Sequence, residues 1–282
     1  MMAVPSWQAL LFVPVGAERH LASAIRQLPD AVILDLEDAI APDQKAAARE
    51  RLAKDQAALS RAGLPCILRV NAPLSEMVQD IAAADLSALS AIMVPKCEDS
   101  RALRNAADLS HGSVSIIALV ETPAALYSLF DLVQVPQLVG LMLGSEDYSA
   151  ALGTDPESGA LDILAAMIAA AAASRGLMAI GFPGSIANFR DLDRHARGLK
   201  RGRDLGMTAA AAIHPAQLPN IRTAFASTPE EHDWAKRVIA AAKPGSGVTA
   251  LVGEMIDAPV LARARRILGM TRQRRNDPAA RN

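Results

Sequence analysis

Two acidic residues, Glu121 and Asp147, follow apolar runs that are separated by one strand–helix repeat. If these runs are neighbouring parallel strands, both carboxylates point into the same mouth of the fold. Two carboxylate ligands, completed by water and substrate oxygens, are the usual way in which proteins hold Mg²⁺. The spacing therefore indicates a magnesium site, while a helix cap or an ion pair stays open as the alternative for each acid.

A second concentration of charge ends the apolar run at 31–36, where Asp35, Glu37 and Asp38 lie within four positions. Ionised carboxylates are costly wherever water is scarce, so packing alone gives no reason for them. Arg69 ends another apolar run. It could face the carboxylate or enolate oxygen of a bound acid, or it could pair with a neighbouring acid. Together these residues predict a ring of acids and bases at one mouth.

Three further residues stand at the ends of apolar runs: Pro14, Lys96 and His214. Lys96 either contributes to the site or lies beside the start of a helix, and His214 either donates from the wall or is structural. The five histidines are scattered without an HxxxH pair, which disfavours zinc. Neither GxxxxGK[ST] nor a GxGxxG after a strand occurs, so the sequence contains no recognisable nucleotide cradle.

Eight short apolar runs recur about every 25–30 residues, at 10–15, 31–36, 65–71, 91–96, 115–121, 138–144, 177–182 and 208–214. The runs are nearly continuous rather than alternating, as expected of strands that are covered on both faces. Helical patterns separate them, such as 43–63, which is rich in Ala, Leu, Lys, Arg and Glu. Eight such units predict an α/β fold, a (β/α)8 TIM barrel over 1–226, with functional groups at the carboxyl ends of the strands.

The pattern changes after the eighth unit. Residues 227–243 predict a helix, with a Ser or Thr cap and Pro229 near its first turn. Residues 245–269 predict a Gly-rich turn, a short strand or hairpin, and another helix. This C-terminal extension, residues 227–282, is the candidate second piece of the chain.

The composition limits the class of protein. The chain has 282 residues, 51% of them hydrophobic, and a formal net charge of −1, which argues against a nucleic-acid or membrane-surface protein. The N-terminal segment lacks the charged region of a signal peptide, and the longest apolar stretch, 163–173, is too short to span a bilayer. Cys66 and Cys97 cannot make a disulfide framework, so we expect buried core cysteines in a cytoplasmic protein.

Several motifs, in this order and spacing, resemble the citrate lyase beta-subunit-like branch of the HpcH/HpaI aldolase superfamily. The resemblance covers nearly the whole chain and implies a TIM barrel of the phosphoenolpyruvate/pyruvate-binding type. The motifs are LFVP at 11–14, AVILDLEDA at 31–39, LRVN at 68–71, VPK at 94–96, ALVETPAA at 118–125, GSEDYSAALG at 144–153, IHPAQ at 213–217 and GEMIDAPVLARARRIL at 253–268.

The resemblance implies an Mg²⁺-dependent carbon–carbon lyase, with Mn²⁺ as an alternative metal. Such enzymes cleave malyl-, citramalyl- or citryl-type thioesters of CoA or an acyl carrier into an α-keto acid and an acyl thioester. The resemblance makes Glu121 and Asp147 the metal ligands and Arg69 the cation beside the keto-acid oxygen. It places Asp35 and Glu37 in the outer shell of the metal, through water.

The same resemblance makes Asp257 an acid–base group on the C-terminal lid, which closes over the site of a neighbouring subunit. The implied assembly is a homotrimer or a dimer of trimers. Lys96 and Pro14 are expected on the CoA side of the site. An aldolase acting on free hydroxy-keto acids, and a beta subunit that needs an acyl-carrier partner, are the alternative functions.

The sequence departs from the family pattern at positions that would line the thioester pocket. Gln8 and Val15 replace an arginine and a glycine that flank LFVP in many relatives. Val252 and Glu254 replace an Asp and a Lys near the C-terminal motif, and the segment after the seventh run reads AIGFPGS. These differences bear on the identity of the substrate, while the predicted metal ligands and Arg69 are intact.

Overall fold

The computed structural model describes residues 2–241, 249–251 and 254–275. The chain divides into two compact units, Met1–Phe225 and Ala226–Asn282. The first unit contains all of the predicted strand–helix repeats, and the second contains the C-terminal extension.

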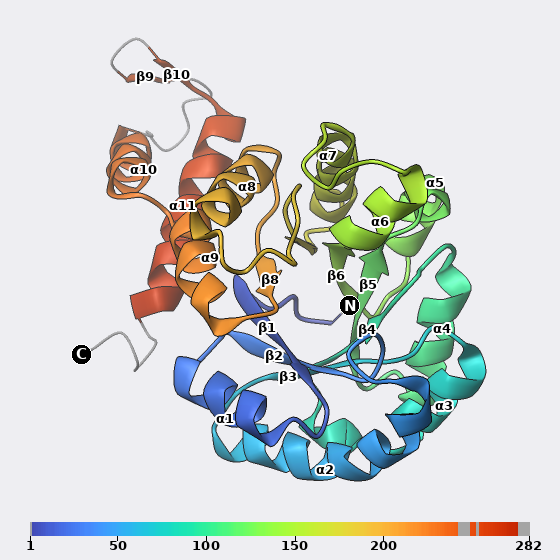
Figure 1. Ribbon diagram of the computed structural model, residues 1–282. Coiled ribbons are helices and arrows are strands. Elements are labelled where there is room, and N and C mark those ends of the chain that lie inside the picture. The colour runs from blue at the N-terminus through green and yellow to red at the C-terminus, as the bar shows by residue number, and fades with distance from the viewer. Residues whose placement is uncertain (1, 242–248, 252–253, 276–282) are drawn as a thin grey trace. The chain divides into compact units, whose positions relative to one another are not determined.

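Eight parallel strands form the first unit (Figure 1). They are β1 (Ala9–Pro14), β2 (Ala31–Asp35), β3 (Cys66–Arg69), β4 (Ala91–Val94), β5 (Ser115–Val120), β6 (Leu138–Leu143), β7 (Met178–Ile180) and β8 (Ala210–Ala212). Their order is β7-β6-β5-β4-β3-β2-β1-β8, and a parallel bridge between Ile180 and Ala209 joins the two ends. The predicted TIM barrel is therefore confirmed. Seven of the eight strands lie inside the predicted runs, and β1 begins one residue before its run.

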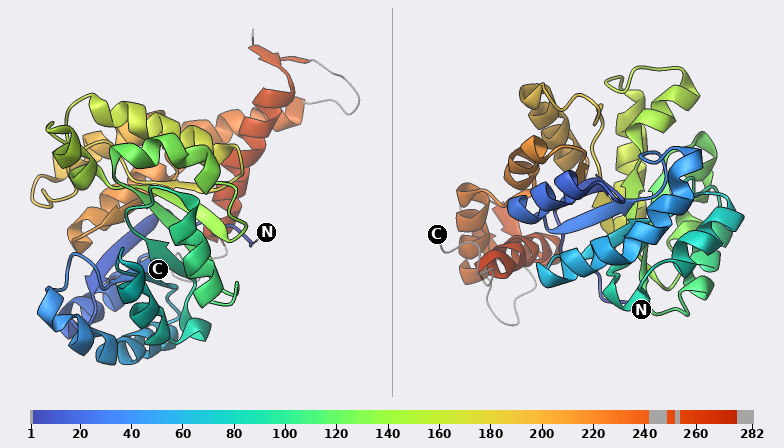
Figure 2. Two further views of the ribbon diagram at one scale, coloured as in Figure 1. Left: turned by 90° about the vertical axis from the view of Figure 1, so that its right-hand side faces the viewer. Right: turned by 60° about the horizontal axis from the view of Figure 1, so that its bottom comes forward.

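Helices surround the barrel (Figure 2). They are α1 (Glu18–Gln27), α2 (Lys45–Arg61), α3 (Leu74–Ala82), α4 (Ser100–Leu109), α5 (Pro123–Leu132), α6 (Ser145–Leu152), α7 (Ala160–Ala173), α8 (Leu192–Asp204) and α9 (Leu218–Phe225). Local signals start several of them. Thr122 accepts a hydrogen bond from the Ala125 N–H and is followed by Pro123, so α5 begins directly after β5.

The strand side chains alternate between two cores. Leu10, Ile33, Ile67 and Ile117 fill the inside of the barrel. The alternate residues of the same strands point outward and pack against the surrounding helices. Both faces of each strand are thus apolar, which explains the continuous runs in the sequence. Cys66 and Cys97 are free and buried, as expected of core cysteines.

The second unit consists of α10 (Pro229–Ala241), an antiparallel hairpin of β9 (Thr249–Leu251) and β10 (Glu254–Ile256), and α11 (Ala258–Arg275). Its small core includes Ala235, Val238, Ile256 and Ala264. The predicted helix, hairpin and second helix are confirmed, while the Gly-rich turn at 245–247 and Val252 lie outside the described residues. Among the helices that the structure describes, none is long and apolar enough to cross a membrane.

Candidate active site

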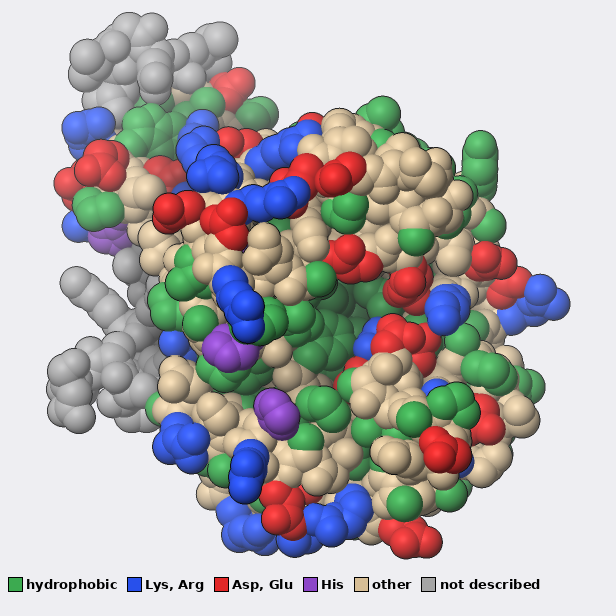
Figure 3. Space-filling model, in the orientation of Figure 1, with side chains coloured by type: hydrophobic (Ala, Val, Ile, Leu, Met, Phe, Trp, Pro, Cys, Tyr) green, Lys and Arg blue, Asp and Glu red, His purple; other side chains and the backbone are tan. Residues whose placement is uncertain are grey.

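A pocket of about 360 Å³ opens at the carboxyl ends of the barrel strands. Six residues singled out in the sequence line it: Pro14, Asp35, Asp38, Arg69, Glu121 and Asp147. Figure 3 shows a hollow with a hydrophobic floor, and acidic, Lys and Arg side chains gather along one side of it. The volume is in the range of small-molecule sites, so this mouth is the candidate active site.

Arg69 is held by carboxylates on one side of the pocket. Its Nε and Nη2 donate to the two oxygens of Asp35 at 2.7 Å each, a bidentate pair. Its Nη1 lies 2.9 Å from Glu37 and 3.1 Å from Asp38, and Phe12 lies below the guanidinium at 5.0 Å. Burial alone would lower the pKa of Arg69, but the three carboxylates raise it. Arg69 therefore pairs with acids and also lines the pocket.

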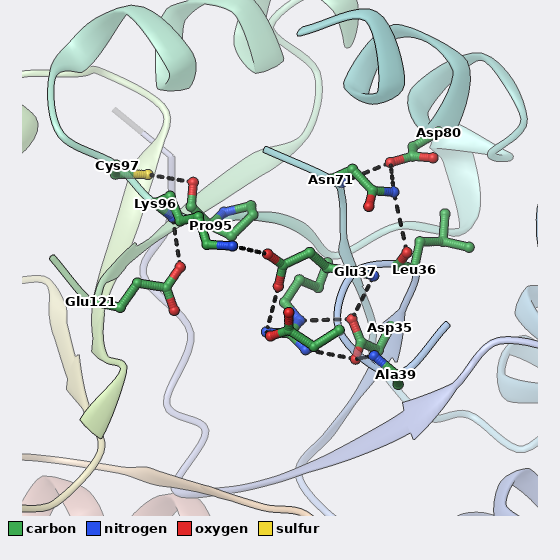
Figure 4. A network of polar contacts seen from close by, with 12 residues as sticks. Asp35, Leu36, Glu37, Ala39, Asn71, Asp80, Pro95, Lys96, Cys97 and Glu121 are labelled. Atoms are coloured by element: carbon green, nitrogen blue, oxygen red, sulfur yellow. Dashed lines mark hydrogen bonds and ion pairs between the residues drawn. The ribbon is translucent and has the colours of Figure 1, made fainter. Parts of the chain in front are cut away.

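Lys96 links this cluster to Glu121 (Figure 4). Its Nζ lies 3.1 Å from Glu37, and its backbone N–H donates to Oε1 of Glu121 at 2.7 Å. The backbone at Lys96 has a φ of +51°, a left-handed conformation that is uncommon for a residue with a side chain. The Lys96 side chain is half-exposed and is not among the pocket-lining residues, so its expected role on the CoA side stays a prediction.

Glu121 follows β5 and is 2% exposed. Burial raises the pKa of Glu121 to about 8, and the nearby Glu37 and Asp147 carboxylates act in the same direction, against the N–H of Lys96. Asp147 lies in the first turn of α6, directly after β6, the neighbour of β5. The two acids therefore meet at adjacent strand exits, as expected from their spacing.

Gly144 has no side chain, and the Glu121 side chain occupies the space that a Cβ at this position would fill. A Cβ at Gly144 would overlap the Cβ of Glu121 and would lie 2.8 Å from its Oε2. The turn between β6 and α6 thus brings backbone directly against the carboxylate, which only a glycine permits without a shift.

The donor set fits a hard divalent cation. Glu121 and Asp147 offer carboxylate oxygens, and the carboxylates at this mouth outnumber the cationic side chains Arg69 and Lys96. Within the described part of the chain, no group of three or more His, Cys, Asp or Glu side chains could hold a metal ion. Glu121 and Asp147 are two carboxylates of the kind that hold Mg²⁺ together with water or substrate oxygens.

The remaining predicted residues have other surroundings. His214 accepts a hydrogen bond from the Ala216 N–H at 3.1 Å and stacks on Phe189 at 4.8 Å, so the structural alternative applies to it. Asp257 belongs to the second unit, where its Oδ1 accepts the Val260 N–H at 3.1 Å at the start of α11. Its role as an acid–base group stays a prediction.

A buried network behind the site was not predicted from the sequence. Asp80 on α3 is fully buried and accepts hydrogen bonds from Arg49 and from the backbone and side chain of Asn71. The Asn71 side chain also donates to the Leu36 carbonyl at 3.2 Å, which ties down the segment that carries Asp35 and Glu37 (Figure 4). An acid on an otherwise ordinary helix gives no sequence signal of this role.

The comparisons with known proteins agree with this fold. The family model described as HpcH/HpaI aldolase/citrate lyase matches residues 8–215. The chain therefore belongs to this family and is an enzyme of its lyase type, which confirms the family expected from the motifs.

Individual relatives match over nearly their full lengths. A citrate lyase subunit beta-like protein of Deinococcus radiodurans is 32% identical, with 93% of this chain and 96% of that protein covered. A (3S)-malyl-CoA thioesterase of Cereibacter sphaeroides is 30% identical, with 93% of each covered. Among solved structures, the protein CitE of Mycobacterium tuberculosis in complex with magnesium, acetoacetate and coenzyme A is 29% identical, with a TM-score of 0.74 over 94% of this chain and 98% of that one.

Proposed function

We propose that this chain is an Mg²⁺-dependent carbon–carbon lyase. It would cleave a β-hydroxyacyl-CoA thioester of the malyl, citramalyl or citryl type into an α-keto acid and an acyl-CoA. The observation that carries this proposal is the pair of carboxylates, Glu121 and Asp147, beside the Arg69 cluster in one pocket. The magnesium, acetoacetate and coenzyme A bound to the Mycobacterium tuberculosis relative support it.

Glu121 and Asp147 would hold the metal, with Asp35 and Glu37 behind them. Bound Mg²⁺ would supply Lewis-acid polarisation of the substrate oxygens. Because Asp35 fixes the Arg69 guanidinium in a bidentate pair, Arg69 keeps one orientation and needs no reorganisation as negative charge develops on a substrate oxygen.

In the cleavage direction, a base of the site would take the proton of the β-hydroxyl, and the hydroxyl carbon would become the keto carbon. The electrons of the broken carbon–carbon bond pass to the thioester, which leaves as an enolate. Asp257 would then supply the proton to the enolate carbon. We propose that Asp257 reaches the site of a neighbouring copy in a trimer or hexamer, so that closure of the C-terminal unit completes the site.

The Cereibacter sphaeroides relative favours a second candidate, hydrolysis of the same kind of thioester. The two reactions differ in their products. A lyase gives a keto acid and an acyl-CoA without releasing a thiol, whereas a thioesterase gives free CoA and a hydroxy acid without releasing a keto acid.

The test is incubation of the purified chain with malyl-, citramalyl- and citryl-CoA, with Mg²⁺ or with a chelator. Keto acid is trapped as its phenylhydrazone, and free thiol is measured with Ellman's reagent in parallel. We expect Mg²⁺-dependent keto acid without thiol. Thiol alone would favour the thioesterase, and neither product from folded protein would reject both candidates.

Variants of the proposed metal ligands sharpen the test. We expect Glu121→Gln and Asp147→Asn to lower kcat/KM at least about 100-fold, because each removes a charge that holds the metal. The matched control is Asp108→Asn, an exposed acid on α4 away from the pocket. Stabilisation by free CoA in a thermal shift would separate a thioester lyase from an aldolase of free hydroxy-keto acids.

A further inference from the structure

The exits of the eight strands divide into two continuous arcs. The exits of β2 to β6 carry the charged groups, which include Asp35, Arg69, Glu121 and Asp147. The exits of β7, β8 and β1 follow next around the barrel, because a bridge joins β7 to β8 and β8 pairs with β1. The pocket-lining side chains there form what we call the apolar arc: Phe12, Pro14, Phe182, Ile186, Ala211 and Ile213.

Phe182 has a fixed place in the apolar arc. A Cβ at Gly198 would lie 2.9 Å from its ring, and a Cβ at Gly202 would lie 3.0 Å from its Cβ, so two glycines of α8 make room for it. The His195 ring meets the Phe182 ring edge-on, with centroids 5.1 Å apart. Close packing against helix α8 therefore holds Phe182 in one position, so its ring forms a fixed wall of the pocket.

Among the described residues, the pocket-lining side chains of the apolar arc include no cation that could pair with a second negative charge on the substrate. Among the described residues that line the pocket, Arg69 is the cationic side chain, and it already contacts the carboxylates of Asp35, Glu37 and Asp38. A carboxylate placed against Phe182 would lose water without gaining a cation, which is strongly unfavourable.

We propose that the apolar arc receives the side chain of the α-keto acid, and that this side chain is an uncharged alkyl group of up to about four carbon atoms. The strand before Phe182, β7, is the neighbour of β6, which leads to Asp147. The side chain of a keto acid bound to a metal at Asp147 would therefore lie next to the Phe182 wall. Coenzyme A is far larger than a cavity of about 360 Å³, so the carrier part of a thioester must lie outside it. This inference rests on the proposed function and narrows it from citryl-type towards alkyl-substituted substrates.

The test compares two keto acids whose side chains have the same number of non-hydrogen atoms. Oxaloacetate carries a carboxymethyl group, and 4-methyl-2-oxopentanoate carries an uncharged isobutyl group. Binding of each is measured by calorimetry with Mg²⁺, with pyruvate and 2-oxobutanoate as smaller members of the series. We expect the isobutyl acid to bind at least about tenfold more tightly than oxaloacetate.

A variant can supply the missing charge. Ile213 lies at the rim and is 42% exposed, so Ile213→Lys places an ammonium group in the apolar arc without burying it. We expect this variant to bind oxaloacetate at least as tightly as the isobutyl acid. The matched control is Ile163→Lys on α7, which is 64% exposed, is not among the lining residues, and should keep the wild-type ratio.

A second variant tests the wall itself. Phe182→Leu removes ring contacts, and we expect it to weaken binding of the isobutyl acid about fivefold and to leave oxaloacetate unchanged. Oxaloacetate binding as tightly as its isostere in the wild type, or an unchanged ratio in folded Ile213→Lys, would overturn this inference and leave the proposed function standing. Absence of binding by every keto acid would overturn both.

Discussion

At the scale of single residues, the site is a set of charges that fix one another. Asp35 fixes Arg69 through two hydrogen bonds, and Glu37 lies between Arg69 and Lys96. Burial raises the pKa of Glu37, while the charge of Arg69 opposes this effect. Each of the three acids at the end of the apolar run contacts the Arg69 guanidinium, and Glu37 also contacts Lys96. These contacts compensate the acids for lost water, which explains their place at the end of an apolar strand.

Asp257 allows its chemical and structural roles to be separated. Asn caps a helix as well as Asp does, so Asp257→Asn should change the free energy of unfolding by less than about 0.5 kcal/mol. If Asp257 transfers a proton, the same variant should lower kcat about 10²- to 10⁴-fold. The measurements are urea denaturation and turnover of the thioester.

The companion variant Asp257→Ala should lose the cap as well, at about 1 kcal/mol. Wild-type kcat in Asp257→Asn would mean that this residue is a helix cap and nothing more.

At the scale of elements, the turn between β6 and α6 sets the position of both proposed metal ligands. It leads directly into the first turn of α6, which carries Asp147, and its Gly144 lies against Glu121 from the neighbouring strand. The approach of backbone to carboxylate is close enough that one added methyl group must displace Glu121.

We therefore expect Gly144→Ala to destabilise the fold by about 1–3 kcal/mol and to weaken Mg²⁺ binding. Urea denaturation and Mg²⁺ titration measure the two effects. Gly159→Ala is the matched control, because a Cβ there meets no atom within 4 Å and its φ is −64°. Unchanged Mg²⁺ affinity in Gly144→Ala would show that the position of Glu121 does not depend on this contact.

The sequence predicted the elements well because their signals are local. Apolar runs mark all eight strands, and the run at 177–182 is longer than β7 because Gly181 turns away with a φ of +123°. The contacts between strands have no local signal. Asp35 and Arg69 stand opposite each other in the register of β2 and β3, which gives them their bidentate pair, but no spacing along the chain reveals that register.

At the scale of the whole molecule, the buried carboxylate of Glu121 couples the site to the stability of the barrel. Its pKa is about 8 in the fold against 4.5 in the unfolded chain, so the folded state binds more protons between these values. This contribution to stability is present below pH 4.5 and is lost as the pH rises through 8. His195 has the opposite effect. Burial lowers its pKa from 6.5 to about 4, so the unfolded chain binds more protons between these values and the free energy of unfolding rises with pH over that range.

Between pH 6.5 and 8, we therefore expect the free energy of unfolding of the metal-free protein to fall by about 2 kcal/mol. Glu121→Gln should remove most of this fall, and Mg²⁺ should offset it, because binding favours the ionised carboxylate. Urea denaturation in chelator across this range is the measurement. Glu50→Gln, an exposed acid on α2, is the control, and a fall that persists in Glu121→Gln would assign it to another group.

The left-handed backbone at Lys96 has a consequence for any survey of this enzyme by mutation. One position makes two contacts, and the one that steadies Glu121 belongs to the peptide N–H rather than to the side chain. Replacing Lys96 by alanine deletes the ammonium group yet leaves that N–H in place. Alanine scanning would thus detect the contact of the Lys96 ammonium group with Glu37, but not the hydrogen bond from the Lys96 N–H to Glu121.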